Sequence, residues 1–265
     1  MVDYYLILVA LILGVVEGAT EFLPISSTGH LIIASDLLNF DNSGHQVFEI
    51  VIQLGAIVAV VMEYRKKLTA TVLGLSHEKS AQDLAINLII AFIPAAILGL
   101  IFHSQIKLYL FNPVTVSVAL IIGGIAMIII EKKMPAKVPT SNSIKKSQAL
   151  VIGLAQCMAL IPGISRAAST IMGGVISGLD RKTATEFSFY LAIPIIFAAS
   201  IFDLTINWNV LSINDLPIFI AGFIAAFFSA RVVIKIFIKY VANHTFIAFG
   251  WYRIIIGTVT LYYFY

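Results

Sequence analysis

Six apolar stretches, each about as long as a bilayer is thick, constrain this chain more than any other feature. A helix needs about 20 apolar residues to cross a membrane. Hydrophobic residues make up 60% of the 265 residues and charged residues 12%, far more apolar surface than a soluble domain of this size needs. The sequence therefore predicts an all-α polytopic membrane protein, with residues 1–265 forming a single integral membrane domain. The predicted spans are 45–64, 83–102, 113–130, 183–203, 216–238 and 245–263.

The composition and motifs exclude several classes of function. The formal net charge is +3, and no basic face is interleaved with aromatic residues, so no nucleic-acid partner is expected. The sequence contains neither the G-x-x-x-x-G-K-[ST] motif of P-loop proteins nor the G-x-G-x-x-G motif of dinucleotide-binding proteins. Chemistry driven by ATP or by a nicotinamide cofactor is therefore not expected.

Two polar stretches interrupt apolar segments that are too short to cross a bilayer. The first stretch covers residues 17–30 and the second covers residues 162–170. Both contain proline and glycine, which end helices. Irregular backbone at membrane depth is tolerated only inside protein or beside a water-filled cavity. Each stretch is therefore predicted to form the tip of a re-entrant helical hairpin.

The two halves of the chain resemble each other. Residues 13–17 (LGVVE) align with 152–156 (IGLAQ), and residues 24–27 (PISS) align with 162–165 (PGIS). Each half contains one hairpin and three spans. Because three spans change the side of the membrane, the second half begins on the opposite side, and we expect two inverted-topology repeats. The boundaries are 1–131 for repeat 1, 132–146 for a basic cytoplasmic linker and 147–265 for repeat 2.

The basic residues divide unequally between the two sides of this topology. One side receives Lys107, while the loops 39–46 and 203–215 on that side carry no Lys or Arg. Cytoplasmic loops are enriched in Lys and Arg. We therefore place the basic side in the cytoplasm and both termini outside. The basic side carries Arg65, Lys66, Lys67, Lys79, Lys132, Lys133, Lys137, Lys145, Lys146, Arg181, Lys182 and Lys239.

Two carboxylates distinguish the first tip. Glu17 and Glu21 lie four residues apart, so on a helix they share one face. They repel each other unless a proton or a cation lies between them, and a hard divalent ion prefers oxygen ligands. A polar pair in a packing seam is the structural alternative. Ionisable groups at membrane depth are rare and usually functional, which favours a metal or acid–base role.

Hydroxyl groups and an imidazole complete the first tip. Ser26, Ser27 and Thr28 follow a proline, so they can cap the next helix or bind an anion at its N-terminus. His30 lies three residues after Ser27, about one helical turn along. A hydroxyl beside an imidazole is typical of a nucleophile and its base.

The second tip carries a cation. Ser165, Arg166, Ser169 and Thr170 follow a Pro-Gly turn and open the next short helix. The planar guanidinium of Arg166 suits bidentate binding of a phosphate. It can instead neutralise one of the carboxylates of the first tip, and the two roles are compatible.

Other polar residues within the spans are weaker candidates. Glu49 and Gln53 share a face of the first span, and Glu186 lies near the start of the fourth. Arg231 and Arg253 lie within late spans. For all five, pairing between helices is favoured over a role in the site.

Four motifs together are similar to those of the bacterial undecaprenyl-diphosphate phosphatase family, also called the bacitracin-resistance family. They are EGATEFLPISSTGH at 17–30, FEIVIQLGAI at 48–57, PGISR at 162–166 and TEFSFYLAIP at 185–194. The resemblance covers nearly the whole chain. It implies six spans with two inverted re-entrant hairpins. It also implies hydrolysis of a C55 polyprenyl diphosphate to the monophosphate carrier lipid, with a divalent cation, outside the inner membrane.

The resemblance also implies roles for individual residues. Ala167 departs from the family motif, which has Ser there, so no catalytic hydroxyl is expected at that position. Matching positions are the acidic pair Glu17 and Glu21, the Ser27 and His30 pair, and Ser165, Arg166 and Thr170.

The hypothesis for the mechanism is attack by Ser27 on the terminal phosphorus, with His30 or Glu21 taking its proton; a metal-activated water is the alternative nucleophile. The cofactor is Mg²⁺ or Ca²⁺, held by Glu17 and Glu21. The expected catalytic residues are Glu21, Ser27, His30 and Arg166. The expected phosphate-binding residues are Ser26, Thr28, Ser165, Arg166, Ser169 and Thr170.

The expected biological setting follows from the same resemblance. The substrate is a polyprenyl diphosphate lipid, the surroundings are the lipids of the bacterial inner membrane, and a homodimer is one assembly to test. The site opens to the outer, periplasmic side. The product is recycled for peptidoglycan synthesis, and the activity confers bacitracin resistance. The competing hypothesis is a transporter that flips polyprenyl phosphate lipids, because inverted repeats with broken helices are also a transporter design.

Overall fold

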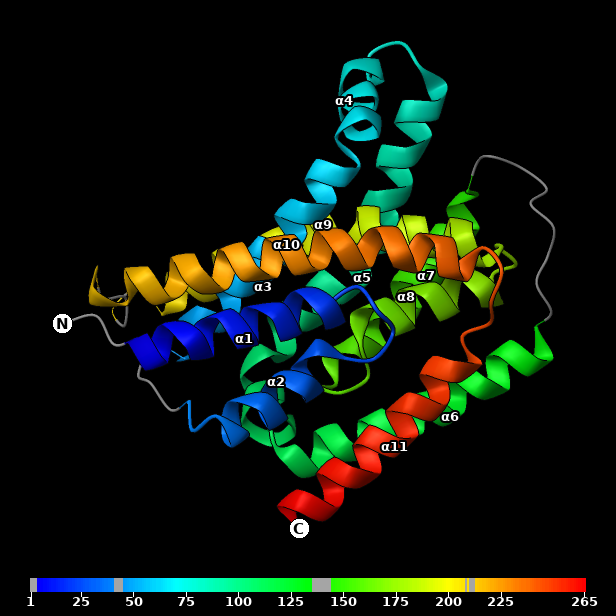
Figure 1. The fold of residues 1–265 in the computed structure, drawn as a ribbon. Helices are drawn as coiled ribbons and strands as arrows, with labels where there is room; N and C mark the ends of the chain where they lie inside the picture. The colour runs from blue at the N-terminus through cyan, green and yellow to red at the C-terminus, as the bar shows by residue number, and fades with distance from the viewer. Residues whose placement is uncertain (1–3, 41–44, 135–143, 208, 210–212) are drawn as a thin grey trace.

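The computed structural model describes residues 4–40, 45–134, 144–207, 209 and 213–265 (Figure 1). These residues form helices and no strand, which confirms the predicted all-α class. Short 3₁₀ turns occur at Cys157–Leu160 and Ile213–Asp215. The helices are α1 (Tyr4–Thr20), α2 (Ser27–Leu37), α3 (His45–Glu63), α4 (Arg65–Gly74), α5 (Lys79–Leu110), α6 (Pro113–Lys133), α7 (Lys146–Gln156), α8 (Arg166–Ile176), α9 (Arg181–Ile206), α10 (Leu216–Val241) and α11 (Ile247–Phe264).

Among the described helices, α5, α6, α9, α10 and α11 are long and apolar enough to cross a membrane. A bend of 72° separates α3 from α4, and the two helices give a further span if they are counted as one. The protein is therefore a multi-pass membrane protein. The sequence does not predict α4, because the basic run Arg65–Lys67 ends the apolar pattern. Lysine and arginine are nevertheless good helix formers, so the helix resumes after the bend.

The helices pack in pairs that bring distant parts of the chain together. Figure 1 shows α1 beside α10, and α6 beside α11. It also shows α4 and the first part of α5 projecting away from the other helices. The short helices of each predicted hairpin contact each other, α1 with α2 and α7 with α8. The two hairpins predicted from the sequence are thus present as packed helix pairs.

Small residues let α1 approach α10 closely. A Cβ atom added at Gly14 would lie 2.3 Å from the carbonyl oxygen of Gly222. One added at Gly18 would lie 2.2 Å from the carbonyl oxygen of Ala226. Glycines four residues apart are common where two helices pack closely in a membrane. This contact fixes the position of α1 and buries Glu17, which lies between the two glycines.

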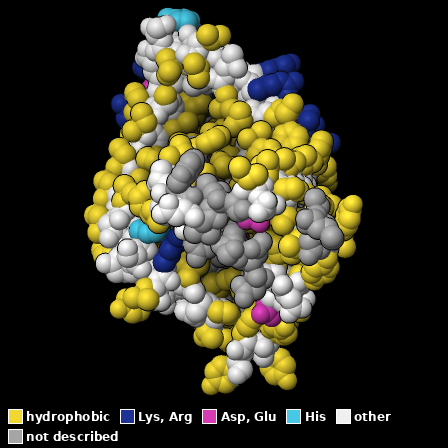
Figure 2. Space-filling model, turned by 90° about the vertical axis from the view of Figure 1, so that its left-hand side faces the viewer, with side chains coloured by type: hydrophobic (Ala, Val, Ile, Leu, Met, Phe, Trp, Pro, Cys, Tyr) yellow, Lys and Arg dark blue, Asp and Glu magenta, His cyan; other side chains and the backbone are white. Residues whose placement is uncertain are grey.

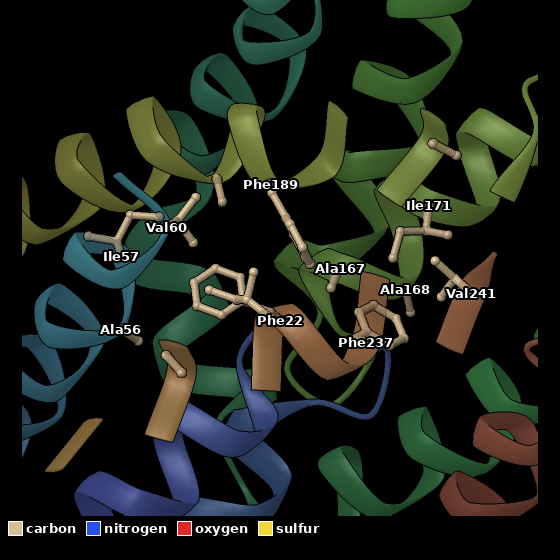
Figure 3. Close-up of a cluster of buried hydrophobic side chains, with 14 of the residues drawn as sticks. Phe22, Ala56, Ile57, Val60, Ala167, Ala168, Ile171, Phe189, Phe237 and Val241 are labelled. Carbon is tan, nitrogen blue, oxygen red and sulfur yellow. The ribbon is translucent and has the colours of Figure 1, made fainter. Parts of the chain in front are cut away.

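A buried apolar cluster joins the two predicted tips (Figure 3). Phe22, from the first tip, meets the ring of Phe189 on α9 edge-on, with 5.5 Å between the ring centroids. Ala167 and Ile171 on α8 belong to the same cluster and are fully buried. Packing of Phe22 against α8 and α9 therefore brings residues next to it toward the second tip.

The outside of the molecule is largely apolar. Figure 2 shows one face, on which hydrophobic side chains predominate and charged side chains are few. Leu100 on α5, Ile224 on α10 and Ile255 on α11 are large apolar side chains that point outward. Lipid chains are the natural surroundings for such a surface, which agrees with the membrane assignment.

Candidate active site

The two tips contain the same unusual turn. Ser26 precedes α2 with a φ of 70°, and its Oγ accepts a hydrogen bond from the amide of Gly29. Ser165 precedes α8 with a φ of 75°, and its Oγ accepts from the amide of Ala168. Positive φ values are uncommon outside glycine. Both serines thus cap the following helix, as one alternative predicted for Ser26, whereas phosphate binding by them stays a prediction.

The matching turns change the alignment of the two halves by one residue. The letters pair 24–27 with 162–165 and so place Ser27 opposite Ser165. The caps instead pair Ser26 with Ser165, which is the register that also pairs Glu17 with Gln156. Similar turns support a repeated unit, while the inverted orientation of the repeats stays a prediction.

Glu21 joins the two tips. Its Oε2 accepts a hydrogen bond of 2.6 Å from the Oγ of Ser27. Its Oε1 lies 3.2 Å from Nη2 of Arg166, in an ion pair from which water is largely excluded. The predicted nucleophile, a carboxylate that accepts its hydrogen bond and the predicted phosphate-binding cation therefore lie in one contact. The sequence predicted that Arg166 could neutralise a carboxylate of the first tip, and Glu21 is that carboxylate.

α9 holds the guanidinium of Arg166 from the other side. Its Nη1 donates to the carbonyl oxygen of Ser188 at 3.0 Å and lies 3.4 Å from the Oγ of Ser188. The hydroxyls of Ser188 and Thr170 share a hydrogen bond of 2.7 Å. The sequence reasoning missed Ser188, although the motif TEFSFYLAIP contains it. Thr170 therefore supports Arg166 through Ser188, and its direct contact with phosphate stays a prediction.

The described hydrogen bonds of His30 do not include Ser27, so His30 as the base, one of the two alternatives from the sequence, stays a prediction. Its Nδ1 lies 2.8 Å from the carbonyl oxygen of Ser26, which can only accept, so Nδ1 carries the hydrogen. Its Nε2 lies 2.7 Å from the hydroxyl of Tyr252 on α11. Both ring nitrogens are therefore occupied. Ser27 and His30 are one helical turn apart in α2, but the hydroxyl of Ser27 donates to Glu21 instead of facing His30.

A cavity of about 430 Å³ lies beside the contact between Ser27 and Glu21. Glu17, Ser27 and Thr28 from the first tip line it. The second carboxylate oxygen of Glu17 is buried and has no hydrogen-bond partner among the described residues. Phosphate and cation chemistry both need such polar groups around a space of this kind. The cavity is lined by Glu17, Ser27, Thr28, Leu31, Glu49, Ile50, Gln53, Lys107, Phe111, Asp203 and Asn207.

Two of these lining residues were weaker candidates in the sequence. Glu49 and Gln53 were predicted to pair between helices rather than to line a site, yet both face the cavity with Glu17. Their positions on one face of α3 were visible in the sequence. The helix that this face meets depends on packing, which a single sequence does not give.

An ion pair between Lys107 and Asp203 also lines the cavity. Lys107 lies near the end of α5 and Asp203 near the end of α9, with 3.3 Å between Nζ and Oδ1. His103 lies at the same distance from this oxygen of Asp203. These helix ends belong to the side on which the sequence places few basic residues.

Ser169 does not join the other predicted site residues. It lines a separate, mainly apolar cavity of about 210 Å³ together with Met127 and Met172. Its Oγ is buried without a hydrogen-bond partner among the described residues. No described contact brings Ser169 to Glu21 or to the cavity beside it, so a phosphate-binding role for Ser169 gains no support.

The sequence matches known proteins over nearly its full length. The family model described as "Bacitracin resistance protein BacA" matches residues 10–259. An undecaprenyl-diphosphatase of Methylobacillus flagellatus is 52% identical over 268 residues, covering 99% of both chains. One from Aromatoleum aromaticum is 51% identical over 262 residues, covering 98% of this chain and 95% of the relative. Undecaprenyl-diphosphatase 1 of Burkholderia cenocepacia is 48% identical over 264 residues, covering 98% and 96%. This chain therefore belongs to the bacitracin resistance protein family.

Proposed function

We propose that this protein is an undecaprenyl-diphosphatase. It removes the terminal phosphate from a C55 polyprenyl diphosphate and leaves the monophosphate carrier lipid, which supplies peptidoglycan synthesis. Loss of the diphosphate explains the link with bacitracin resistance that the family description carries. One observation carries the proposal: Ser27, Glu21 and Arg166 meet in a buried contact between the two tips.

In the first step, Ser27 Oγ attacks the terminal phosphorus. The bond between that phosphorus and the bridging oxygen breaks, and the lipid monophosphate leaves. The proton of Ser27 passes to Glu21, which already accepts its hydrogen bond. A side chain that takes a proton within hydrogen-bond reach is the usual requirement for general base catalysis.

Proton transfer changes the partner of Arg166. While Glu21 is ionised, it neutralises the guanidinium. Once Glu21 is protonated, the positive charge of Arg166 becomes available to the phosphoryl group, whose transfer depends on electrostatic stabilisation. Ser188 keeps the guanidinium in place meanwhile. Water then releases phosphate from Ser27, and Glu21 returns the proton to the Ser27 oxygen.

A divalent cation, Mg²⁺ or Ca²⁺, fits the donor groups beside this contact. Glu17, which has one buried carboxylate oxygen without a hydrogen-bond partner, lines a cavity together with the oxygen-bearing side chains of Ser27, Thr28 and Gln53, and hard cations prefer oxygen ligands. Glu21 was predicted as the second ligand, but both its oxygens are already paired. A bound cation would neutralise charge on the phosphates.

The protein itself supplies few ligands for such a cation. Among the described residues, no group of three or more His, Cys, Asp or Glu side chains is arranged to hold a metal ion. We therefore propose that Glu17 would hold the cation, which would supply positive charge to the phosphates of the substrate. Cations that act on phosphate substrates are commonly bound in this way, by one or two carboxylates plus the substrate.

We propose that the site opens outward from the bacterial inner membrane. Lys107 and Asp203 line the cavity near the ends of α5 and α9, on the side with few basic residues. The positive-inside rule assigns that side to the exterior. The polyprenyl tail would remain among lipids against the apolar helix faces. A homodimer is a further proposal, which the size of the purified protein in detergent can test.

The transporter hypothesis is not favoured. A flippase needs groups that bind phosphate, but it does not need a serine whose hydroxyl donates to a buried carboxylate. The relatives described above are named for hydrolysis of the diphosphate.

Phosphate release by the purified protein tests the proposal. Detergent-solubilised protein is mixed with undecaprenyl diphosphate, with Mg²⁺, with Ca²⁺ or with EDTA. Release of one phosphate per lipid, suppressed by EDTA, is the expected result. Thermal denaturation checks that the protein is folded. If folded protein releases no phosphate with any cation, the proposed function is rejected and transport is favoured.

A further inference from the structure

Arg253 is a buried cation outside the catalytic contact. It lies in the middle of α11 with 0% of its surface exposed. No carboxylate pairs with it among the described residues. A charge buried without a partner is costly unless hydrogen bonds replace those of water. What surrounds Arg253 must therefore explain why the fold keeps it.

The guanidinium donates to four backbone carbonyl oxygens from three separate segments. Nη1 donates to Pro24 at 3.3 Å, in the first turn. Nη2 donates to Gly163 at 3.0 Å, in the second turn, and to Ala119 at 3.4 Å. Nε donates to Leu120 at 3.4 Å, also on α6. Carbonyl groups in irregular backbone at membrane depth need such donors, because no lipid group can supply them.

The two turn carbonyls occupy equivalent positions. Pro24 lies two residues before the cap Ser26, and Gly163 lies two residues before the cap Ser165. The residue after each cap is catalytic: Ser27 follows Ser26, and Arg166 follows Ser165. Arg253 therefore bridges matching points of the two turns, three residues away from the groups that must meet.

The rest of the fold leaves room for this bridge. A Cβ atom added at Gly123 on α6 would lie 2.1 Å from Nη2 of Arg253. Only a residue without a side chain allows the guanidinium to reach both turns from there. A lysine at position 253 would offer one compact ammonium, whereas the guanidinium is a planar fork with five donors. The bridge is therefore specific for arginine.

We propose that Arg253 is a positioning residue that fastens the two turns to each other, and so holds Ser27 and Glu21 against Arg166. Its described hydrogen bonds go to backbone carbonyl oxygens and not to Ser27, Glu21 or Arg166. The catalytic part of this inference rests on the proposed function, while the bridge between the turns stands on the hydrogen bonds alone.

The test compares Arg253→Lys and Arg253→Met with Arg231→Lys, which changes a partly exposed arginine of α10. Rates are expressed per folded molecule, with the folded fraction taken from thermal denaturation. Arg253→Lys should lower kcat by about 100-fold, the effect of misplacing reacting groups by about 1 Å, with little change in KM. Arg231→Lys should resemble the wild type. If folded Arg253→Lys has wild-type kcat, the positioning role is overturned.

Hydrogen–deuterium exchange of the same proteins tests the bridge without activity. Amides in both turns should exchange faster in Arg253→Lys, while those in the packed α1–α10 pair stay protected. Unchanged exchange in either turn would overturn the bridge. If the wild type releases no phosphate, the proposed function fails, but this exchange experiment still decides whether Arg253 joins the turns.

Gly123→Ala provides a second route if Arg253→Lys does not fold but Arg253→Met does. The added methyl group should displace the guanidinium and lower kcat in the wild type. In the Arg253→Met background, where the fork is absent, the same change should have a much smaller effect. Equal effects in both backgrounds would show that Gly123 does not act through Arg253 and would overturn the arrangement proposed here.

Discussion

The Oγ of Ser27 donates a 2.6 Å hydrogen bond to Oε2 of Glu21, while the other oxygen of Glu21 faces Arg166. This relationship links a hydroxyl and a carboxylate of one turn to a cation 145 residues away. The carboxylate is thus positioned to accept a proton from one side and to release a guanidinium on the other. Each prediction below changes one part of this arrangement.

Glu21→Gln keeps the size of the side chain but removes its ability to accept the proton of Ser27. We expect kcat to fall by about 10²–10⁴-fold, the usual contribution of a general base. Phosphate release by the purified variant measures this. Glu186→Gln is the matched control, because Glu186 pairs with exposed Lys182 and should be dispensable. A Glu21→Gln rate within about tenfold of wild type would contradict proton transfer to Glu21.

Glu17→Gln should alter the response to cations rather than the catalytic step. Glu17 lines the cavity and has a carboxylate oxygen without a hydrogen-bond partner, so loss of its charge should raise the cation concentration needed for half-maximal rate. The increase should be at least about tenfold, since even a residue that only supports a ligand is worth that much. Titration of Mg²⁺ and Ca²⁺ after EDTA treatment measures it. Asp203→Asn, which removes another carboxylate that lines the cavity, serves as the control. If the titration curves of Glu17→Gln and the wild type coincide, Glu17 does not anchor the cation.

Arg166→Lys should retain the fold but lose most activity. Lysine keeps the charge that faces Glu21, but it cannot also reach Ser188 with a planar fork. Arg166→Ala should additionally destabilise the protein by about 3–5 kcal/mol, because it leaves Glu21 buried without its partner. Ala167→Ser changes the neighbouring buried residue and should cost far less in rate. Similar small losses in phosphate release for Arg166→Ala and Ala167→Ser would reject Arg166 as the phosphate-binding cation.

His30→Gln and Tyr252→Phe test whether His30 is structural. Both variants break the hydrogen bond between the imidazole and the Tyr252 hydroxyl. Each variant should lower the free energy of unfolding by about 1 kcal/mol, which is typical of one hydrogen bond. The double variant should lower it little more than His30→Gln alone. Kinetics and thermal denaturation of the three variants measure this. A loss of several orders of magnitude for His30→Gln, with Tyr252→Phe unaffected, would support His30 as the base.

The fold follows from the sequence wherever a local pattern is sufficient. Apolar run lengths predict the spans, and Pro24 and Pro162 mark the two turns. The ends of the helices are less predictable, because helical hydrogen bonds continue beyond the apolar part. For example, α5 runs from Lys79 to Leu110, whereas the apolar pattern covers 83–102. The bend before α4 also follows from packing rather than from hydropathy.

The site is predictable in its members but less so in its contacts. Glu17, Glu21, Ser27 and Arg166 stand out because ionisable and hydroxyl groups are rare among apolar residues. The partner of each group depends on side chains that meet through folding. Ser188 resembled an ordinary polar residue of a span, and Arg253 resembled one half of an interhelical pair. Ser188 accepts from Arg166 through its own backbone carbonyl oxygen, and Arg253 donates to backbone carbonyl oxygens of other segments. Contacts made through backbone groups leave no sign in a sequence.

The single-turnover rate of phosphate release by Ser27→Ala tests the central claim most directly. The matched control is Ser26→Ala, which removes the neighbouring hydroxyl and its long capping hydrogen bond of 3.5 Å. If Ser27 is the nucleophile, its loss should lower the rate by at least about 10³-fold, while Ser26→Ala retains much of the activity. A folded Ser27→Ala protein that keeps more than about a tenth of the wild-type rate would contradict a serine nucleophile and the account built on its contact with Glu21.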